Sequence, residues 1–280
     1  MRDTLKIFFD KNPNFVSMIM GISTILNKLV SRWVLIGAWA RYLNLNHQLP
    51  SIERITQDYD FLIVIKDWDN FERIKKAMGD SGFVQALRLP YRFIKRPIIV
   101  DLLPFSREIV KNNKLKWEGY DIELDFSGSE DALSQTKTIH LQENVSFEIL
   151  SVPGLVLLKI LSYLDRPDDR AHDLEDVFFC FKHYEDGVKR FDVCGMNIDG
   201  ENILYEHSGA YLIGVEAGRF TKDIEARQKV SAFCDTFLVQ DSEIVARAAD
   251  LARSFLVVED RRCEVVLLIR RFRSGFLGKK

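Results

Sequence analysis

The sequence predicts an α+β fold, in which a mixed β-sheet with flanking helices is followed by a helical C-terminal region. The first 150 residues alternate strand-like and helix-like segments without a run of parallel units, which favours a mixed sheet with helices packed on it. From Ser151 onward helical spacing of apolar residues dominates. We therefore predict a sheet-containing domain at residues 1–150 and a helical domain at residues 151–280.

In the first 150 residues each expected element follows from a local pattern. In chain order these are a helix at 14–30, a strand and a helix separated by a glycine turn at Gly37, a buried strand at 61–65, a helix at 66–83, and two hairpins at 88–105 and 137–150. Asp67 or Asp69 is predicted to cap the helix at 66–83, and Gly79 or Gly82 to end it.

The C-terminal region is predicted from helix signals alone. Ser151 precedes Pro153 in the first turn of a capped helix, and Pro167 lies beyond its end. Further helical periodicity occurs at residues 171–187, 209–220, 225–238 and 242–258. No internal repeat or low-complexity segment interrupts this pattern.

Composition restricts the class of protein. The chain has 280 residues, 47% of them hydrophobic, and a formal net charge of −2, which indicates a globular protein rather than a general polyanion binder. A nucleic-acid partner would therefore need a local basic patch. The four cysteines are scattered without zinc-ligand spacing, which fits a reducing cytosol. Without a signal peptide or a membrane-length apolar run, we expect a cytoplasmic protein with no membrane partner.

Two aspartates precede the strand FLIVI, one residue apart. Because strand side chains alternate, Asp58 and Asp60 share one face, where two like charges repel each other unless a positive group lies between them. A third aspartate, Asp101, stands inside the apolar segment IIVDLL. If the two strands are neighbours, three carboxylates converge, and these are ligands suited to Mg²⁺, with two ions able to hold a nucleotide's phosphates.

A structural interpretation of these aspartates is equally consistent with their spacing. Asp58 and Asp60 would then simply end a loop, and Asp101 would pair with a nearby arginine such as Arg92 or Arg107.

The surrounding residues carry a family resemblance. A glycine turn opens a helix at Gly37, the motif Arg-x-Thr-x-Asp-x-Asp occupies residues 54–60, and Asp101 lies on a later strand. This arrangement resembles the DNA-polymerase-beta-like nucleotidyltransferase superfamily, and within it the AbiEii/AbiGii-type toxins of type IV toxin–antitoxin pairs. The resemblance spans roughly residues 33–180. It implies that Asp58, Asp60 and Asp101 are metal ligands and catalytic residues, and that Gly37, Ala38, Arg54 and Thr56 bind the nucleotide.

The resemblance extends into the helical region. Lys159 is the only charge in a largely apolar helix, so its ammonium must either reach solvent beside Ser162 or face an anion. By resemblance it binds phosphate, and Asp173 is a catalytic position, with helix N-capping as the alternative for Asp173. One departure is Ala38, where the family has a second glycine or a serine, so a hydroxyl contact to phosphate is lost.

The resemblance implies a metal-dependent nucleotidyltransferase. Mg²⁺, or Mn²⁺ in its place, would bind a nucleoside triphosphate, an acceptor hydroxyl would attack the α-phosphate with Asp101 taking its proton, and pyrophosphate would leave. The implied acceptor is RNA, such as the end of a tRNA, or a protein, and the implied partner is a cognate antitoxin. Two alternatives stay open, a small-molecule nucleotidyltransferase of the antibiotic-modifying kind and an inactive binding protein that retains the fold.

Three basic stretches are candidates for an RNA surface. They occupy residues 88–96, 111–116 and 270–280. The first mixes arginines with aromatic residues, as an RNA-binding surface does. An ordinary hairpin or a solvated loop or tail explains each stretch more simply.

Overall fold

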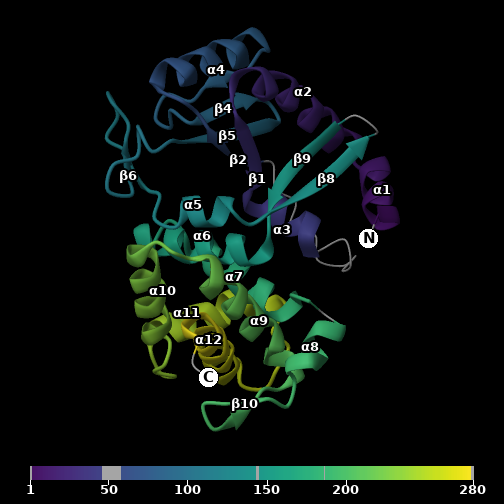
Figure 1. Ribbon diagram of the computed structural model, residues 1–280, viewed down its shortest axis with the longest axis vertical. Coiled ribbons are helices and arrows are strands. Elements are labelled where there is room, and N and C mark those ends of the chain that lie inside the picture. Colours follow the sequence, from purple (N-terminus) through teal and green to yellow (C-terminus); the bar gives the residue numbers. More distant parts are fainter. Residues whose placement is uncertain (1, 46–57, 143–144, 186, 279–280) are drawn as a thin grey trace. The chain divides into compact units, whose positions relative to one another are not determined.

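The computed structural model describes residues 2–45, 58–142, 145–185 and 187–278 (Figure 1). The chain divides into two compact units, one formed by residues 1–126 and 136–151 and the other by residues 127–135 and 152–280. The predicted fold class is confirmed, because the chain contains a mixed sheet with flanking helices followed by a helical region. The predicted domains at residues 1–150 and 151–280 stay a prediction.

A mixed seven-stranded sheet forms the centre of the first unit. Its strands, in spatial order, are β3 (Val84–Gln85), β4 (Arg92–Lys95), β5 (Ile98–Phe105), β2 (Asp58–Val64), β1 (Arg32–Ile36), β9 (Val145–Leu150) and β8 (Thr136–Gln142). The pairs β2–β5 and β1–β9 are parallel, and the other neighbours are antiparallel. A separate ribbon pairs β6 (Lys114–Lys116) with β7 (Glu123–Asp125).

The helices of the first unit are α1 (Arg2–Lys11), α2 (Pro13–Leu29), α3 (Gly37–Leu45) and α4 (Trp68–Asp80). Helix α4 begins as predicted, because the Asp67 carboxylate caps it by accepting a hydrogen bond from the Asn70 backbone at 2.8 Å. Gly82, with φ of +85°, follows its end. The Asn70 side chain donates to the Leu29 carbonyl at 2.7 Å and so joins α4 to the end of α2, which lies beside it in Figure 1.

Aromatic packing fixes the start of α3 on the sheet. The Trp39 ring stacks on Tyr59, with centroids 5.3 Å apart and planes 13° from parallel, and Phe15 of α2 packs against Trp39 at 4.7 Å. Because Tyr59 alternates with Asp58 and Asp60 along β2, this cluster covers the face of the strand opposite the two aspartates. The carboxylate face and the apolar face of β2 are thus separated by the pleat.

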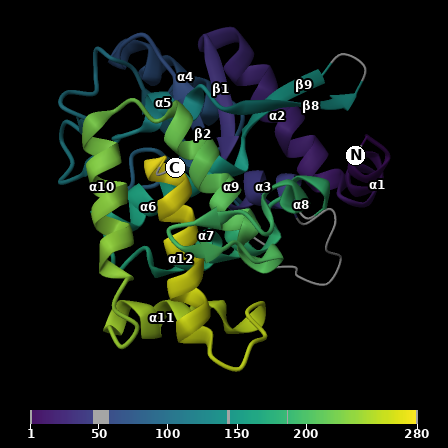
Figure 2. The same cartoon turned by 60° about the horizontal axis from the view of Figure 1, so that its bottom comes forward.

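The second unit is helical (Figure 2). Its helices are α5 (Ser129–Leu133), α6 (Val152–Asp165), α7 (Ala171–His183), α8 (Val188–Val193), α9 (Tyr205–Phe220), α10 (Ile224–Thr236), α11 (Glu243–Leu251), a 3₁₀ turn (Ala252–Ser254) and α12 (Arg261–Leu277), with a short hairpin of β10 (Asn197–Ile198) and β11 (Glu201–Asn202). None of the helices in the described part of the chain is both long and apolar enough to cross a membrane.

Helices α9 and α12 pack at backbone distance. A Cβ added at Gly214 would lie 2.9 Å from the Phe276 nitrogen, and one at Gly275 would lie 2.8 Å from the Val215 nitrogen, so a side chain at either position would force the helices apart. Phe272 and Phe276 are fully buried. The interpretation of residues 270–280 as a solvated tail is therefore wrong for 270–277, because this stretch ends helix α12 and carries two core aromatics four residues apart.

Candidate active site

The three predicted aspartates lie on one face of two neighbouring strands. Strands β2 and β5 run parallel, and their register sets Asp60 directly opposite Asp101. Asp58 stands two residues earlier on β2 and therefore on the same face. Asp101 is buried, with 6% of its surface exposed, whereas Asp58 and Asp60 are partly exposed. The strand pairing thus gathers three acidic side chains in one place.

Arg92 of β4 binds two of these carboxylates. Its Nε and Nη2 donate to the two oxygens of Asp101, each at 2.8 Å, and Nη2 also contacts Asp58 Oδ2 at 3.3 Å. The hydrogen bonds to Asp101 raise the pKa of Arg92, although its partial burial acts in the opposite direction. The ion pair that the sequence left open is therefore present, and Arg92 forms it.

A backbone turn at Gly37 borders Asp60 on the other side. Gly37 has φ of +66°, and a Cβ at this position would lie 2.9 Å from Cγ of Asp60, so only glycine fits without moving the carboxylate. The preceding residue, Ile36, pairs with Asp60 across β1 and β2. Helix α3 starts at this turn with Ala38 as its second residue, so backbone N–H groups rather than a hydroxyl are available near Asp60.

The donor chemistry of this face fits a divalent cation of the Mg²⁺ type, because carboxylate oxygens are its preferred protein ligands. Within the described ranges, however, no three Asp, Glu, His or Cys side chains are already arranged as a metal-ligand set. Arg92 occupies oxygens of Asp58 and Asp101. The residues fit in type and in position on the sheet. A cation would have to displace the Arg92 guanidinium from these carboxylates or share their oxygens with it. Arg54 and Thr56, the other residues of the motif, lie outside the described residues.

Lys159 and Asp173 belong to the second unit, where they pair with each other. Lys159 Nζ lies 2.6 Å from Asp173 Oδ1 and 2.8 Å from Asp176 Oδ2. Burial lowers the pKa of Lys159, but the two carboxylates outweigh it and raise the pKa above its usual value. The lysine thus faces anions rather than solvent beside Ser162. Its predicted binding to phosphate stays a prediction.

The N-capping alternative for Asp173 is wrong. Arg170 stands at the N-cap of α7 without a side-chain capping bond, and Asp173 lies inside the helix with 5% of its surface exposed. Asp176 is a second partner of Lys159 that was not predicted from the sequence. The signal was available, because residues three apart on a helix lie on one face.

In the described parts of the basic stretches, most of the basic side chains interact with other groups of the same chain. Lys114 pairs with Asp125 at 3.3 Å, and Lys116 pairs with Glu123 at 3.3 Å across the β6–β7 ribbon. Arg273 pairs with Asp235 at 3.0 Å. These contacts favour the simpler interpretation of the stretches as ordinary structure rather than as an RNA surface.

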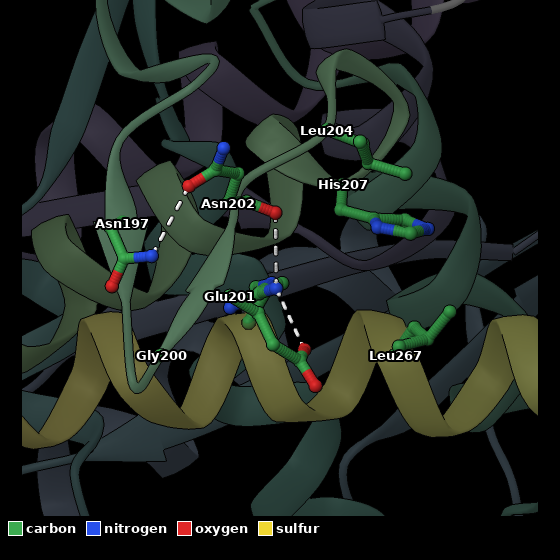
Figure 3. A pocket seen from close by; sticks show the side chains of 8 residues that line it. Asn197, Gly200, Glu201, Asn202, Leu204, His207 and Leu267 are labelled. Atoms are coloured by element: carbon green, nitrogen blue, oxygen red, sulfur yellow. Dashed lines mark hydrogen bonds and ion pairs between the residues drawn. The ribbon is translucent and has the colours of Figure 1, made fainter.

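A cavity of about 570 Å³ in the second unit contains none of the predicted site residues (Figure 3). It lies beside the β10–β11 hairpin, α9 and α12. Arg271 on its wall is buried and donates to the carbonyls of Ile198 at 3.1 Å and Asn202 at 3.2 Å, and to Glu201 at 3.0 Å. These bonds hold the hairpin against α12. The Arg271 guanidinium therefore has a structural role in the wall of this cavity.

Comparison with known families identifies the family of this chain. The sequence matches the family described as "Nucleotidyl transferase AbiEii toxin, Type IV TA system" over residues 24–195, which is more than half of the chain. The matched span runs from α2 to just beyond α8 and contains the carboxylates of β2 and β5 together with Lys159 and Asp173. A search of curated proteins found no significant match. The chain belongs to the AbiEii family of nucleotidyl transferase toxins of type IV toxin–antitoxin systems.

Proposed function

We propose that the protein is a metal-dependent nucleotidyltransferase, which moves a nucleoside monophosphate from a nucleoside triphosphate to an acceptor hydroxyl and releases pyrophosphate. Family membership supports a transferase activity in general. The observation that carries the specific reaction is the position of Asp58, Asp60 and Asp101 on one sheet face, bordered by the Gly37 turn.

In this proposal Asp58, Asp60 and Asp101 hold one or two Mg²⁺ ions, or Mn²⁺ in their place. When bound, such ions neutralise charge on the triphosphate and favour ionisation of the attacking hydroxyl. Asp101 takes the proton of the acceptor. Its buried position and the two bonds from Arg92 hold its carboxylate in one orientation, which supports in-line attack because positioning contributes most of the rate in phosphoryl-type transfers.

Backbone groups at the start of α3 bind the terminal phosphates in this proposal. A helix N-terminus presents free N–H groups and a partial positive charge, both of which favour phosphate. Gly37 and Ala38 contribute through the main chain, since neither carries a polar side chain. The roles of Arg54, Thr56 and Lys159 in nucleotide binding, and of Asp173 in catalysis, rest on the family resemblance.

The acceptor that we propose first is RNA, such as the end of a tRNA, and the second is a hydroxyl on a protein. In this proposal transfer to either acceptor is the toxic event and a cognate antitoxin opposes it; the description of the family as a type IV toxin supports the toxin–antitoxin role.

The test uses the purified protein with each of the four ribonucleoside triphosphates in turn, Mg²⁺, and total RNA, a protein extract or an aminoglycoside antibiotic as the acceptor. Each triphosphate is labelled on the α-phosphate in one reaction and on the γ-phosphate in another. We expect α-label in RNA or protein, no transfer of γ-label, and loss of transfer with EDTA. Transfer of γ-label would indicate a kinase and contradict the proposal. Labelling of an aminoglycoside alone would favour the small-molecule alternative, and no transfer to any acceptor would favour an inactive binding protein.

A further inference from the structure

We infer that Arg92 competes with the divalent cation for Asp58, and that it stays bound to Asp101 and positions this carboxylate for the reaction. The inference rests on the proposed function, because it concerns how the same carboxylates receive their cation. The sequence indicated Arg92 only as a structural ion-pair partner of Asp101.

The first observation is an asymmetry in the contacts of Arg92. Its guanidinium makes two bonds of 2.8 Å to Asp101, whose side chain is 8% exposed, but a single contact of 3.3 Å to Asp58, whose side chain is 37% exposed. A bidentate pair with a buried carboxylate is stronger and better defined than a single, partly solvated contact. A cation that enters the site therefore separates Arg92 from Asp58 first, while the bond to Asp101 persists.

The second observation is the charge on this face before a cation binds. Three carboxylates on neighbouring strands repel one another, and burial of Asp101 without a partner would be costly. Arg92 offsets both effects, because its single positive charge contacts two of the three groups. The apoprotein can thus fold with its carboxylates in place. The same charge then repels the arriving cation and holds oxygens that the cation needs.

The position of Arg92 follows from the hairpin register. Arg96 and Pro97 form a two-residue connection, Lys95 pairs with Ile98 across it, and this pairing sets Arg92 opposite Asp101. The side chains of two directly opposed residues lie on the same face of an antiparallel pair. The arginine is therefore built into the sheet rather than carried on a loop, which suits a group that must hold Asp101 in one orientation.

The consequence separates cation affinity from turnover. Without Arg92 the carboxylates would bind a cation more tightly, since one competitor and one repelling charge are removed. Turnover would nevertheless fall, because Asp101 would lose the fork that orients it. A merely structural arginine would affect stability alone and would leave the cation affinity of the folded protein unchanged.

The experiment measures Mn²⁺ binding to the full-length protein by electron paramagnetic resonance, with and without a non-hydrolysable triphosphate. It compares wild type with Arg92→Gln. We expect the Mn²⁺ dissociation constant of the variant to fall about tenfold, a change of about 1.4 kcal/mol in binding free energy. We also expect kcat for nucleotide transfer to fall at saturating Mn²⁺. The matched control is Arg32→Gln. Arg32 pairs with Glu148 at the end of β1 that lies away from Asp60, so its replacement should leave Mn²⁺ affinity unchanged.

Unchanged or weaker Mn²⁺ binding by folded Arg92→Gln would overturn the inference while leaving the proposed function intact. Absence of Mn²⁺ binding by the wild type, with and without triphosphate, would instead remove the proposed function and this inference together. If Arg92→Gln does not fold, Arg92→Lys provides the comparison. A lysine keeps the charge but loses the two-pronged geometry, so we expect about threefold tighter Mn²⁺ binding and a reduced kcat, and wild-type values for both would count against the inference.

Discussion

Asp60→Asn is expected to lower nucleotide transfer roughly a thousandfold, the scale on which removal of a single charge-stabilising group acts in enzymes. An amide has nearly the same shape as the carboxylate, but it is a poor ligand for Mg²⁺ and carries no charge. Asp60 lies between the Gly37 turn and Asp101, so no other described side chain takes the same place in the sheet. The measurement is the rate of α-label transfer at saturating triphosphate and Mg²⁺.

The fold should tolerate this change. Asp60 is one of three like charges on its face, and loss of one charge relieves repulsion. We therefore expect the melting temperature of Asp60→Asn to equal or exceed that of wild type in the absence of metal. Asp69→Asn is the matched control, because Asp69 is an exposed residue in the first turn of α4. A folded Asp60→Asn protein that transfers nucleotide at the wild-type rate would contradict the assignment of this residue.

Lys159→Met is expected to lower the free energy of unfolding of the helical unit by about 3–5 kcal/mol, the range for breaking a buried ion pair by removing one partner. The lysine lies between Asp173 and Asp176, whose side chains are only 7% and 9% exposed. Without it the two buried carboxylates lose the cation that lies between them, and their like charges repel each other. Replacing all three residues together, by Met at 159 and Leu at 173 and 176, should restore most of the loss, because no charge then remains buried at these three positions.

The choice of signal decides whether this effect is seen. All four tryptophans lie in the first unit and none lies in α6 or α7, so tryptophan fluorescence is not a direct signal of these helices. Urea unfolding should be followed by far-UV circular dichroism, which detects helix. Lys189→Met is the control, since the exposed Lys189 of the same unit pairs with Glu185 at 2.7 Å, and a loss of at most about 1 kcal/mol is expected. A Lys159→Met protein as stable as this control would show that Lys159 has no structural role, and an increase in KM for the triphosphate alone would favour phosphate binding.

Local patterns in the sequence were sufficient to predict much of the fold. The strand, glycine turn and helix around Gly37 and the Asp67 cap of α4 depend on residues close together in the chain, so they can be predicted without tertiary information. Helix α12 was missed because its arginines suggested solvent, although Phe272 and Phe276 stand four residues apart, about one helical turn, and are buried against α9. The β10–β11 hairpin was also missed, since two-residue strands have no periodicity.

The candidate site shows the same division between local and long-range information. The common face of Asp58 and Asp60 follows from alternation along a single strand. The pairing of Asp60 with Asp101 depends on two strands becoming parallel neighbours, and the local sequence pattern does not determine which strands pair. Arg92 could have been placed opposite Asp101 by assuming a tight turn at Arg96 and Pro97. The partners of Lys159 required knowledge of how α6 packs on α7, which propensity alone does not supply.

The most direct test of the central claim is the location of a divalent cation in a crystal of the protein with Mn²⁺ and a non-hydrolysable triphosphate. The account predicts an anomalous-scattering peak within coordination distance of oxygens from Asp58, Asp60 and Asp101, with Arg92 no longer in contact with Asp58 but still bound to Asp101. A well-ordered triphosphate with no peak at these three carboxylates, or with its Mn²⁺ bound elsewhere, would contradict it.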